Sequence, residues 1–231
     1  MIREKNISSC RDCNISSKCF QHLYPDELAF INGKKIQLVY KKGENLFKEG
    51  AFSPYVMYVA DGLVRVYLQA GYKKEVNIRL ARNGDFLAFS SLFGNDVFNY
   101  SAAALKESII CMIDKKSLRI LLEKNSLFAM QILSKNCHDE SYLLEALRNI
   151  STKHMRGKLA TALLYLSSEQ FRGLEVFRYM TRQDIAGFAF ISPESAIKFI
   201  KEFERDAIIS AKGKNIDVLD REKLEEISRR G

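Results

Sequence analysis

The chain has 231 residues, of which 47% are hydrophobic and 28% charged, so it is long enough for one large domain or two ordinary ones. Apolar runs such as residues 55–60 are far too short to cross a bilayer, which excludes an integral membrane protein, and the polar first residues lack a signal peptide, so we expect a cytoplasmic protein. The formal net charge of +8 favours polyanionic partners, but residues 151–231 hold 15 Lys and Arg against 12 Asp and Glu, so charge alone does not locate a binding surface for them.

Residues 1–25 form a polar lead that contains three of the five cysteines. From about Ile36 to Ile113, short β-rich runs alternate with glycine-containing turns at intervals of roughly ten residues. Between two of these runs, Asp61-Gly62 predicts a β-hairpin. The pattern as a whole predicts an antiparallel barrel or roll.

The periodicity then changes to that of helices. It predicts a short helix over residues 115–123, a long one over 126–149, and a third over 152–168 with Ser151 as its N-cap. The long helix carries an incomplete apolar stripe, made of Ile132, Leu133, Leu143, Leu144, Leu147 and Ile150. Such a helix either packs one side on its own roll and the other on a partner chain, or lies wholly in an intramolecular core. The pattern leaves both arrangements open.

Two short helices and a small wing are predicted after residue 180. Thr181 with Asp184 resembles a capping box, and Ser192 followed by Pro193 combines an N-cap with proline at the first helical position. Two short strands around a glycine turn are expected in ISAKGKNIDVL, and Asp220 caps a last charged helix. This order predicts a helix-turn-helix with a wing.

A helix-turn-helix places its second helix in the major groove, where the first turns meet base edges. On that helix Glu194 can accept a hydrogen bond from cytosine N4, Lys198 can donate to guanine, and Ile197 can touch a thymine methyl group. Phosphate contacts are expected from Arg182, Lys201, Lys212 and Lys214. The alternative is that Glu194 is an acid favoured by the helix dipole and that the lysines form a solvated face.

A resemblance to the C-terminal winged helix of the CRP/FNR family of bacterial transcription regulators is carried by MTRQDIAGFAFISPESAIKFIKEFERDAIISAKGKNIDVL. The preceding β-rich part, with LFKEG, DGLVRVY and GDFLAF, is similar to that family's effector roll. The resemblance implies an α+β fold with a cyclic-nucleotide-binding-like β-roll, a long dimerisation helix and a winged helix. It implies double-stranded DNA, a second copy of the chain and RNA polymerase as partners. Enzymatic activity is not expected, because no catalytic constellation stands out.

On this resemblance the chain divides into four parts, which are a cysteine-containing cluster-binding segment (1–25), an effector roll (26–125), a dimerisation helix (126–150) and a DNA-binding domain (151–231). Three residues depart from the family pattern. Lys198 stands where the family usually has Arg, so a compact ammonium group replaces a planar guanidinium that could bind guanine through two hydrogen bonds. Ile197 stands where the FNR branch often has Ser. Phe190 lies in a turn that usually contains Gly, so it is strained if the backbone is left-handed there, unless the turn has another shape.

Family members that bind cyclic nucleotide carry a Glu for the ribose and an Arg-Ser pair for the phosphate. Here the expected Glu position is apolar, around residues 87–89, and the Arg-Ser pair would fall near residues 99–101. No Arg occurs from residue 83 to residue 118. Because a buried phosphate without a cationic partner is costly to desolvate, we do not expect a cyclic nucleotide as the ligand.

Cys10, Cys13 and Cys19 give the spacing C-x2-C-x5-C in a chain expected to stay in a reducing compartment. Three thiolates within ten residues can hold one soft metal centre, for which zinc is the usual competitor. CRDCNISSKC is similar to the cluster-binding segment of the family's oxygen-sensing FNR branch, which implies a [4Fe–4S] cluster. Cys111 matches that branch's fourth ligand in position and context, and Cys137 is the spare.

The resemblance also implies a mechanism. Without oxygen the cluster ties the lead to the roll and favours a dimer, whose two recognition helices match major-groove faces about 34 Å apart. Oxygen degrades the cluster, the dimer weakens and DNA is released. The alternatives are a family regulator with another signal such as nitric oxide, a zinc-stabilised interaction protein, and an iron–sulfur electron-transfer protein.

Overall fold

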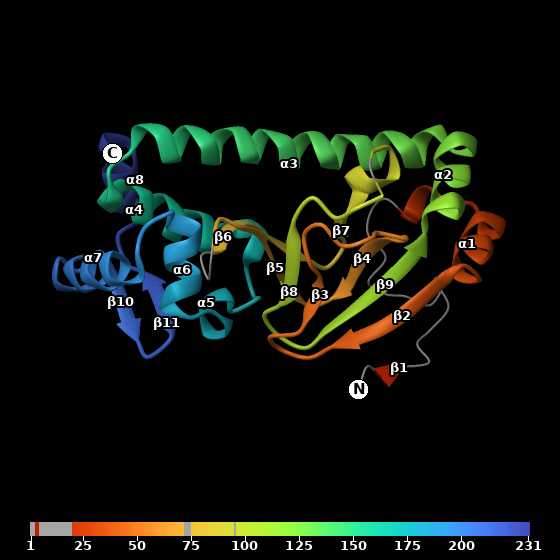
Figure 1. Ribbon diagram of the computed structural model, residues 1–231. Coiled ribbons are helices and arrows are strands. Elements are labelled where there is room, and N and C mark those ends of the chain that lie inside the picture. The colour runs from red at the N-terminus through yellow and green to blue at the C-terminus, as the bar shows by residue number, and fades with distance from the viewer. Residues whose placement is uncertain (1–2, 5–19, 72–74, 95) are drawn as a thin grey trace. The chain divides into compact units, whose positions relative to one another are not determined.

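The computed structural model describes residues 3–4, 20–71, 75–94 and 96–231 (Figure 1). The chain divides into two compact units, residues 1–69 with 80–141 and residues 70–79 with 142–231. None of the described helices is both long enough and apolar enough to cross a membrane.

The first unit is a β-roll of two sheets with helices packed on it, which confirms the predicted fold class (Figure 1). One sheet has the order β1-β2-β9-β4-β7 and the other the order β3-β8-β5-β6. The strands are β1 Arg3–Glu4, β2 Lys35–Tyr40, β3 Asn45–Phe47, β4 Tyr55–Asp61, β5 Leu63–Gln69, β6 Glu75–Arg82, β7 Phe86–Leu87, β8 Ser101–Ala104 and β9 Ser108–Asp114. Residues 75–79 of β6 belong to the second unit.

The prediction of a β-hairpin at Asp61-Gly62 is wrong, because the two strands that flank it lie in different sheets. β4 ends at Asp61 and β5 begins at Leu63, but β4 pairs with β9 and β7 while β5 lies in the other sheet, beside β8. Gly62 is therefore a corner where the chain changes sheets. It has φ of +139°, and an added Cβ would stand 2.2 Å from the Oγ of Ser108 on β9, so only glycine fits.

Helices cover the outer face of the β2–β9–β4 sheet. They are α1 Pro25–Asn32, α2 Lys115–Lys124 and the first turns of α3 Ser126–Thr152. Side chains from β4, β9 and these helices form one buried cluster that includes Tyr58, Cys111 and Phe128, together with Phe20 from the 3-10 turn η1 (Phe20–His22). These side chains form the hydrophobic core between the sheet and the helices. This core contains Cys111, one of the proposed ligands of the iron–sulfur cluster.

The long helix runs past its predicted end. Ser151 was expected to cap the next helix, but α3 continues to Thr152 and the Oγ of Ser151 donates to the carbonyl oxygen of Leu147 at 3.0 Å. A serine hydroxyl serves equally as an N-cap or as a bond to the preceding turn, and the continuing helix selects the second. Helix α4 starts only at Met155, with His154 as the N-cap residue.

The second unit is a helical domain with a two-stranded wing. Its elements are α4 Met155–Leu166, η3 Glu169–Phe171, α5 Val176–Tyr179, α6 Arg182–Ala189, α7 Pro193–Arg205, β10 Ile209–Lys212, β11 Asn215–Val218 and α8 Arg221–Arg230. Leu159 and Leu163 on α4, Ile185 on α6 and Phe203 on α7 are fully buried, so α4 is the centre around which α6 and α7 are fixed. Asp220 caps α8 as expected, accepting from the backbone N–H of Lys223 at 2.9 Å.

Candidate functional site

Both helices of the helix-turn-helix begin as predicted. Thr181 and Asp184 form a reciprocal capping box, in which Thr181 Oγ1 accepts from the Asp184 N–H at 3.1 Å and Asp184 Oδ2 accepts from the Thr181 N–H at 2.7 Å. Ser192 Oγ accepts from the Ser195 N–H at 3.2 Å, and Pro193 is the first helical residue of α7. These caps fix where α7 starts, and therefore which of its side chains lie in the first turns.

The turn between the two helices has a left-handed residue at Phe190, with φ of 55° and ψ of 37°. The N–H of Ile191 donates to the Ala186 carbonyl at 3.2 Å and that of Phe190 to the Gly187 carbonyl at 3.4 Å, which is the Schellman pattern. Glycine is the usual residue here, so Phe190 carries a backbone strain of about 1 kcal/mol or more. Of the two shapes left open by the sequence, the turn has the strained one.

The outer face of α7 carries the three predicted base-contacting residues. Glu194, Ile197 and Lys198 are all exposed, while Ala196, Ile200 and Phe203 on the opposite side are buried. Hydrogen bonds from its own backbone and from Ser192 lower the pKa of Glu194, so its carboxylate is charged. The face therefore offers one acceptor, one apolar contact and one cationic donor within about one and a half helical turns.

The predicted phosphate-contacting residues surround this face in two different states. Lys201 on α7 and Lys212 and Lys214 at the wing are exposed. Arg182 is partly buried and donates from its guanidinium to the carbonyl oxygen of Gly213 in the wing turn at 2.8 Å. Burial lowers the pKa of Arg182 and the nearby Glu204 partly offsets this, but a guanidinium stays charged. Arg182 thus ties the start of α6 to the wing.

A further residue at this domain was missed by the sequence reasoning. Asn77 on β6 is 1% exposed and donates from Nδ2 to the carbonyl oxygen of Asp184 on α6 at 2.7 Å. The only sequence signal is an asparagine at an inward position of the β-run EVNIRL. Its contact fixes the part of β6 that belongs to the second unit against α6.

Cys111 is the one proposed cluster ligand that the structure describes. It is buried in the middle of β9, where its register partners are Gln37 on β2 and Tyr58 on β4. Phe20, the first described residue after Cys19, contacts Tyr58 edge-on with 4.9 Å between ring centroids. Phe20 therefore belongs to the same buried hydrophobic core as Cys111.

The other cysteines give less information. Cys10, Cys13 and Cys19 lie outside the described residues. Cys137, the spare, is exposed on α3. In the part of the chain that the structure describes, no three His, Cys, Asp or Glu side chains are grouped as metal ligands.

Comparisons with known proteins agree with this arrangement. Residues 37–125 match the family described as "Cyclic nucleotide-binding domain" and residues 157–227 the "Crp-like helix-turn-helix domain". The chain is 28% identical over 230 residues to the "Fumarate and nitrate reduction regulatory protein" of Vibrio cholerae, covering 95% of this chain and 90% of that protein. It is 24% identical over 228 residues to the "Transcriptional activator protein FnrA" of Stutzerimonas stutzeri, with 95% and 92% covered. Its fold is similar to that of a CooA mutant from Carboxydothermus hydrogenoformans, with a TM-score of 0.74, 18% identity and 98% of each chain covered.

Proposed function

Because this chain belongs to the CRP/FNR family of DNA-binding transcription regulators, on its FNR-like branch, we propose that it senses oxygen through a [4Fe–4S] cluster held in part by Cys111. The family consists of regulators, and the chain is not an enzyme. One observation carries the sensor proposal. Cys111 is buried in the same hydrophobic core as Phe20, the residue that follows Cys19 in the chain.

DNA reading is assigned to the exposed face of α7. With this helix in the major groove, Glu194 accepts from cytosine, Lys198 donates to guanine and Ile197 contacts a thymine methyl group. The surrounding cations neutralise phosphates; they are Arg182, Lys201, Lys212 and Lys214. Arg182 donates one hydrogen bond to the wing at Gly213, and its other N–H groups can donate to a phosphate oxygen.

A second copy of the chain is the proposed partner of α3. Its exposed residues recur with alternating spacings of three and four, which is the heptad spacing of a two-helix seam: Met130, Leu133, Cys137, Glu140, Leu144 and Leu147. Leu144 and Leu147 are 62% and 60% exposed, which is unusual for leucines on an unpartnered helix. A dimer formed along this seam would bind two half-sites about 34 Å apart. RNA polymerase stays a partner predicted from the resemblance alone.

The described residues fit the proposed cluster at the one ligand that they include. Cys10, Cys13, Cys19 and Cys111 would supply the four thiolates that such a cluster takes. When bound, the cluster supplies an oxygen-sensitive link between the lead and the roll. Cys111 offers its thiol from the middle of a strand paired on both sides, so this ligand is held rigidly.

The path from that site to the dimer helix is short. The centroid of the Phe20 ring lies 5.9 Å from that of Phe128, which is buried on the first turn of α3. Whether the segment before Phe20 is tied down therefore bears directly on the start of α3. In this proposal the cluster-bound lead holds Phe20 in place and favours the α3 arrangement that pairs with a second copy.

The proposal is tested by purifying the protein without oxygen and measuring visible absorbance, iron and sulfide, with operator affinity determined before and after exposure to air. We expect a cluster whose loss in air weakens DNA binding. Stoichiometric zinc without iron would instead show a zinc-stabilised segment. A cluster that is reduced reversibly without any change in DNA affinity would indicate electron transfer, and loss of binding with nitric oxide but not with oxygen would change the signal.

A further inference from the structure

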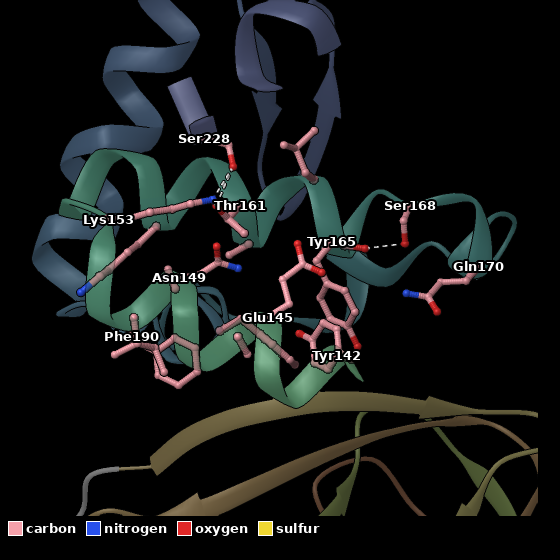
Figure 2. A pocket seen from close by; sticks show the side chains of 17 residues that line it. Tyr142, Glu145, Asn149, Lys153, Thr161, Tyr165, Ser168, Gln170, Phe190 and Ser228 are labelled. Carbon is pink, nitrogen blue, oxygen red and sulfur yellow. Dashed lines mark hydrogen bonds between the residues drawn. The ribbon is translucent and has the colours of Figure 1, made fainter. Parts of the chain in front are cut away.

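The second unit contains a cavity of about 350 Å³ that no part of the proposed function uses (Figure 2). It is lined by the last turns of α3, by α4, by the end of α6 and by Ser228 of α8. Its volume is in the range of pockets that hold small metabolites. Neither the proposed cluster ligands nor the proposed DNA contacts line it.

One end of the cavity is cationic. Lys153, in the bend between α3 and α4, donates from Nζ to Thr161 Oγ1 at 2.8 Å and to Ser228 Oγ at 2.9 Å, as Figure 2 shows. Among the described residues no carboxylate oxygen lies within 4.0 Å of this nitrogen, and an ammonium group has a third donor. Loss of hydration lowers the pKa of Lys153, with Glu145 acting in the opposite direction. A bound carboxylate would form an ion pair with this ammonium group.

The other end is aromatic, and an acid lies between the two. The rings of Tyr142 and Tyr165 stack with 4.6 Å between centroids and form a flat wall. Burial, the neighbouring Tyr165 and Glu145 raise the pKa of Tyr142, so its hydroxyl group is protonated at neutral pH. Glu145 and Asn149, one helical turn apart on α3, line the middle of the cavity (Figure 2).

We propose that this cavity binds a free α-amino acid with an aromatic side chain. Lys153 receives the carboxylate through the N–H that is not bonded to Thr161 or Ser228; Glu145 receives the α-ammonium group; and the side chain lies against the tyrosine stack. A zwitterionic ligand matches a lining that contains two lysines, Lys153 and Lys158, and the carboxylate of Glu145.

The position of the cavity also connects it to the helix-turn-helix. Phe188, Ala189 and Phe190 belong to its lining, and Phe190 is the left-handed residue in the turn between α6 and α7. An occupant therefore contacts the strained turn directly.

The test is calorimetric titration of the full-length protein with L-phenylalanine and two analogues, 3-phenylpropionate, which lacks the ammonium group, and 2-phenylethylamine, which lacks the carboxylate. We expect L-phenylalanine to bind with a Kd of about 1 mM or below, and each analogue to bind at least roughly tenfold more weakly. No binding of L-phenylalanine at about 10 mM, or equal affinity for the three compounds, would overturn the proposal.

Variants assign the two charges. Lys153→Met should weaken L-phenylalanine roughly tenfold and leave 2-phenylethylamine unchanged, and Glu145→Gln should weaken it similarly and leave 3-phenylpropionate unchanged. Lys223→Met, at an exposed position of α8 away from the cavity lining, is the matched control and should keep the wild-type Kd. Circular dichroism confirms folding of each variant, and a wild-type Kd in both Lys153→Met and Glu145→Gln would refute the assigned site.

Discussion

Replacing Gly187 on α6 by Ala should destabilise the DNA-binding unit, although alanine is the better helix former. A Cβ at this position would stand 2.7 Å from Nδ2 of Asn77 and 3.1 Å from its Cγ. Because Asn77 is buried and bonded to the Asp184 carbonyl, it cannot move aside without losing that hydrogen bond. Alanine gains about 1 kcal/mol of helix propensity, whereas overpacking and the lost bond cost roughly 2–4 kcal/mol. The net loss should be about 1–3 kcal/mol.

Hydrogen exchange of the α6 amides measures this loss locally, without requiring the whole chain to unfold in one step. The control is the same substitution in an Asn77→Ala background, where the obstructing amide is gone. There Gly187→Ala should be neutral or stabilising by up to about 1 kcal/mol, so the sign of the effect changes. An equal loss in both backgrounds would refute the reasoning, because the Asn77 contact would not be its cause.

Three further predictions concern the roll, the DNA face and the dimer. Gly62→Ala should lower the free energy of unfolding in urea by more than about 3 kcal/mol, because it combines a φ of +139° with a steric clash. Gly43→Ala, with φ of +85° and no atom within 4 Å, should lower it by only about 1 kcal/mol. Equal losses for the two variants would contradict the assignment of Gly62 as the corner between the sheets. Lys198→Ala should reduce the discrimination between bases at one position of the operator by about 1–3 kcal/mol, and an unchanged discrimination would refute the proposed base contact. Lys201→Ala should weaken binding to all DNA sequences and reduce the slope of log affinity against log salt concentration by about one. Leu144→Glu should shift the protein toward monomer in sedimentation analysis, and a dimer of undiminished stability would exclude α3 as the interface.

Features set by local chemistry were predictable from the sequence. The caps at Thr181, Ser192 and Asp220 depend on side chains within three residues of the backbone groups that they bind, and all three are confirmed. The hairpin at Asp61-Gly62 failed because the partner of β4 is β9, a strand that comes almost fifty residues later in the chain. Strand pairing at that separation is decided by the closure of the roll, which a dipeptide does not encode.

The same distinction separates the parts of the candidate sites. The exposed face of α7 follows from the helix start at Pro193 and from helical periodicity. The docking of Asn77 on α6 and the position of Lys153 in a cavity depend on contacts across many residues, as in the hydrogen bond from Lys153 to Ser228. No motif marks such contacts. For the cavity the one local signal is Tyr142, Glu145 and Asn149 on one side of α3, a pattern that fits any half-exposed helix.

The identity of the fourth cluster ligand is tested most directly by the iron content of two variants purified without oxygen. The account predicts about four irons per chain in Cys137→Ala, as in the unaltered protein, and loss of most of this iron in Cys111→Ala. Both substitutions remove one sulfur atom, but Cys111 is buried in the same hydrophobic core as Phe20, whereas Cys137 is exposed. A Cys111→Ala protein that keeps a full complement of iron would contradict the account.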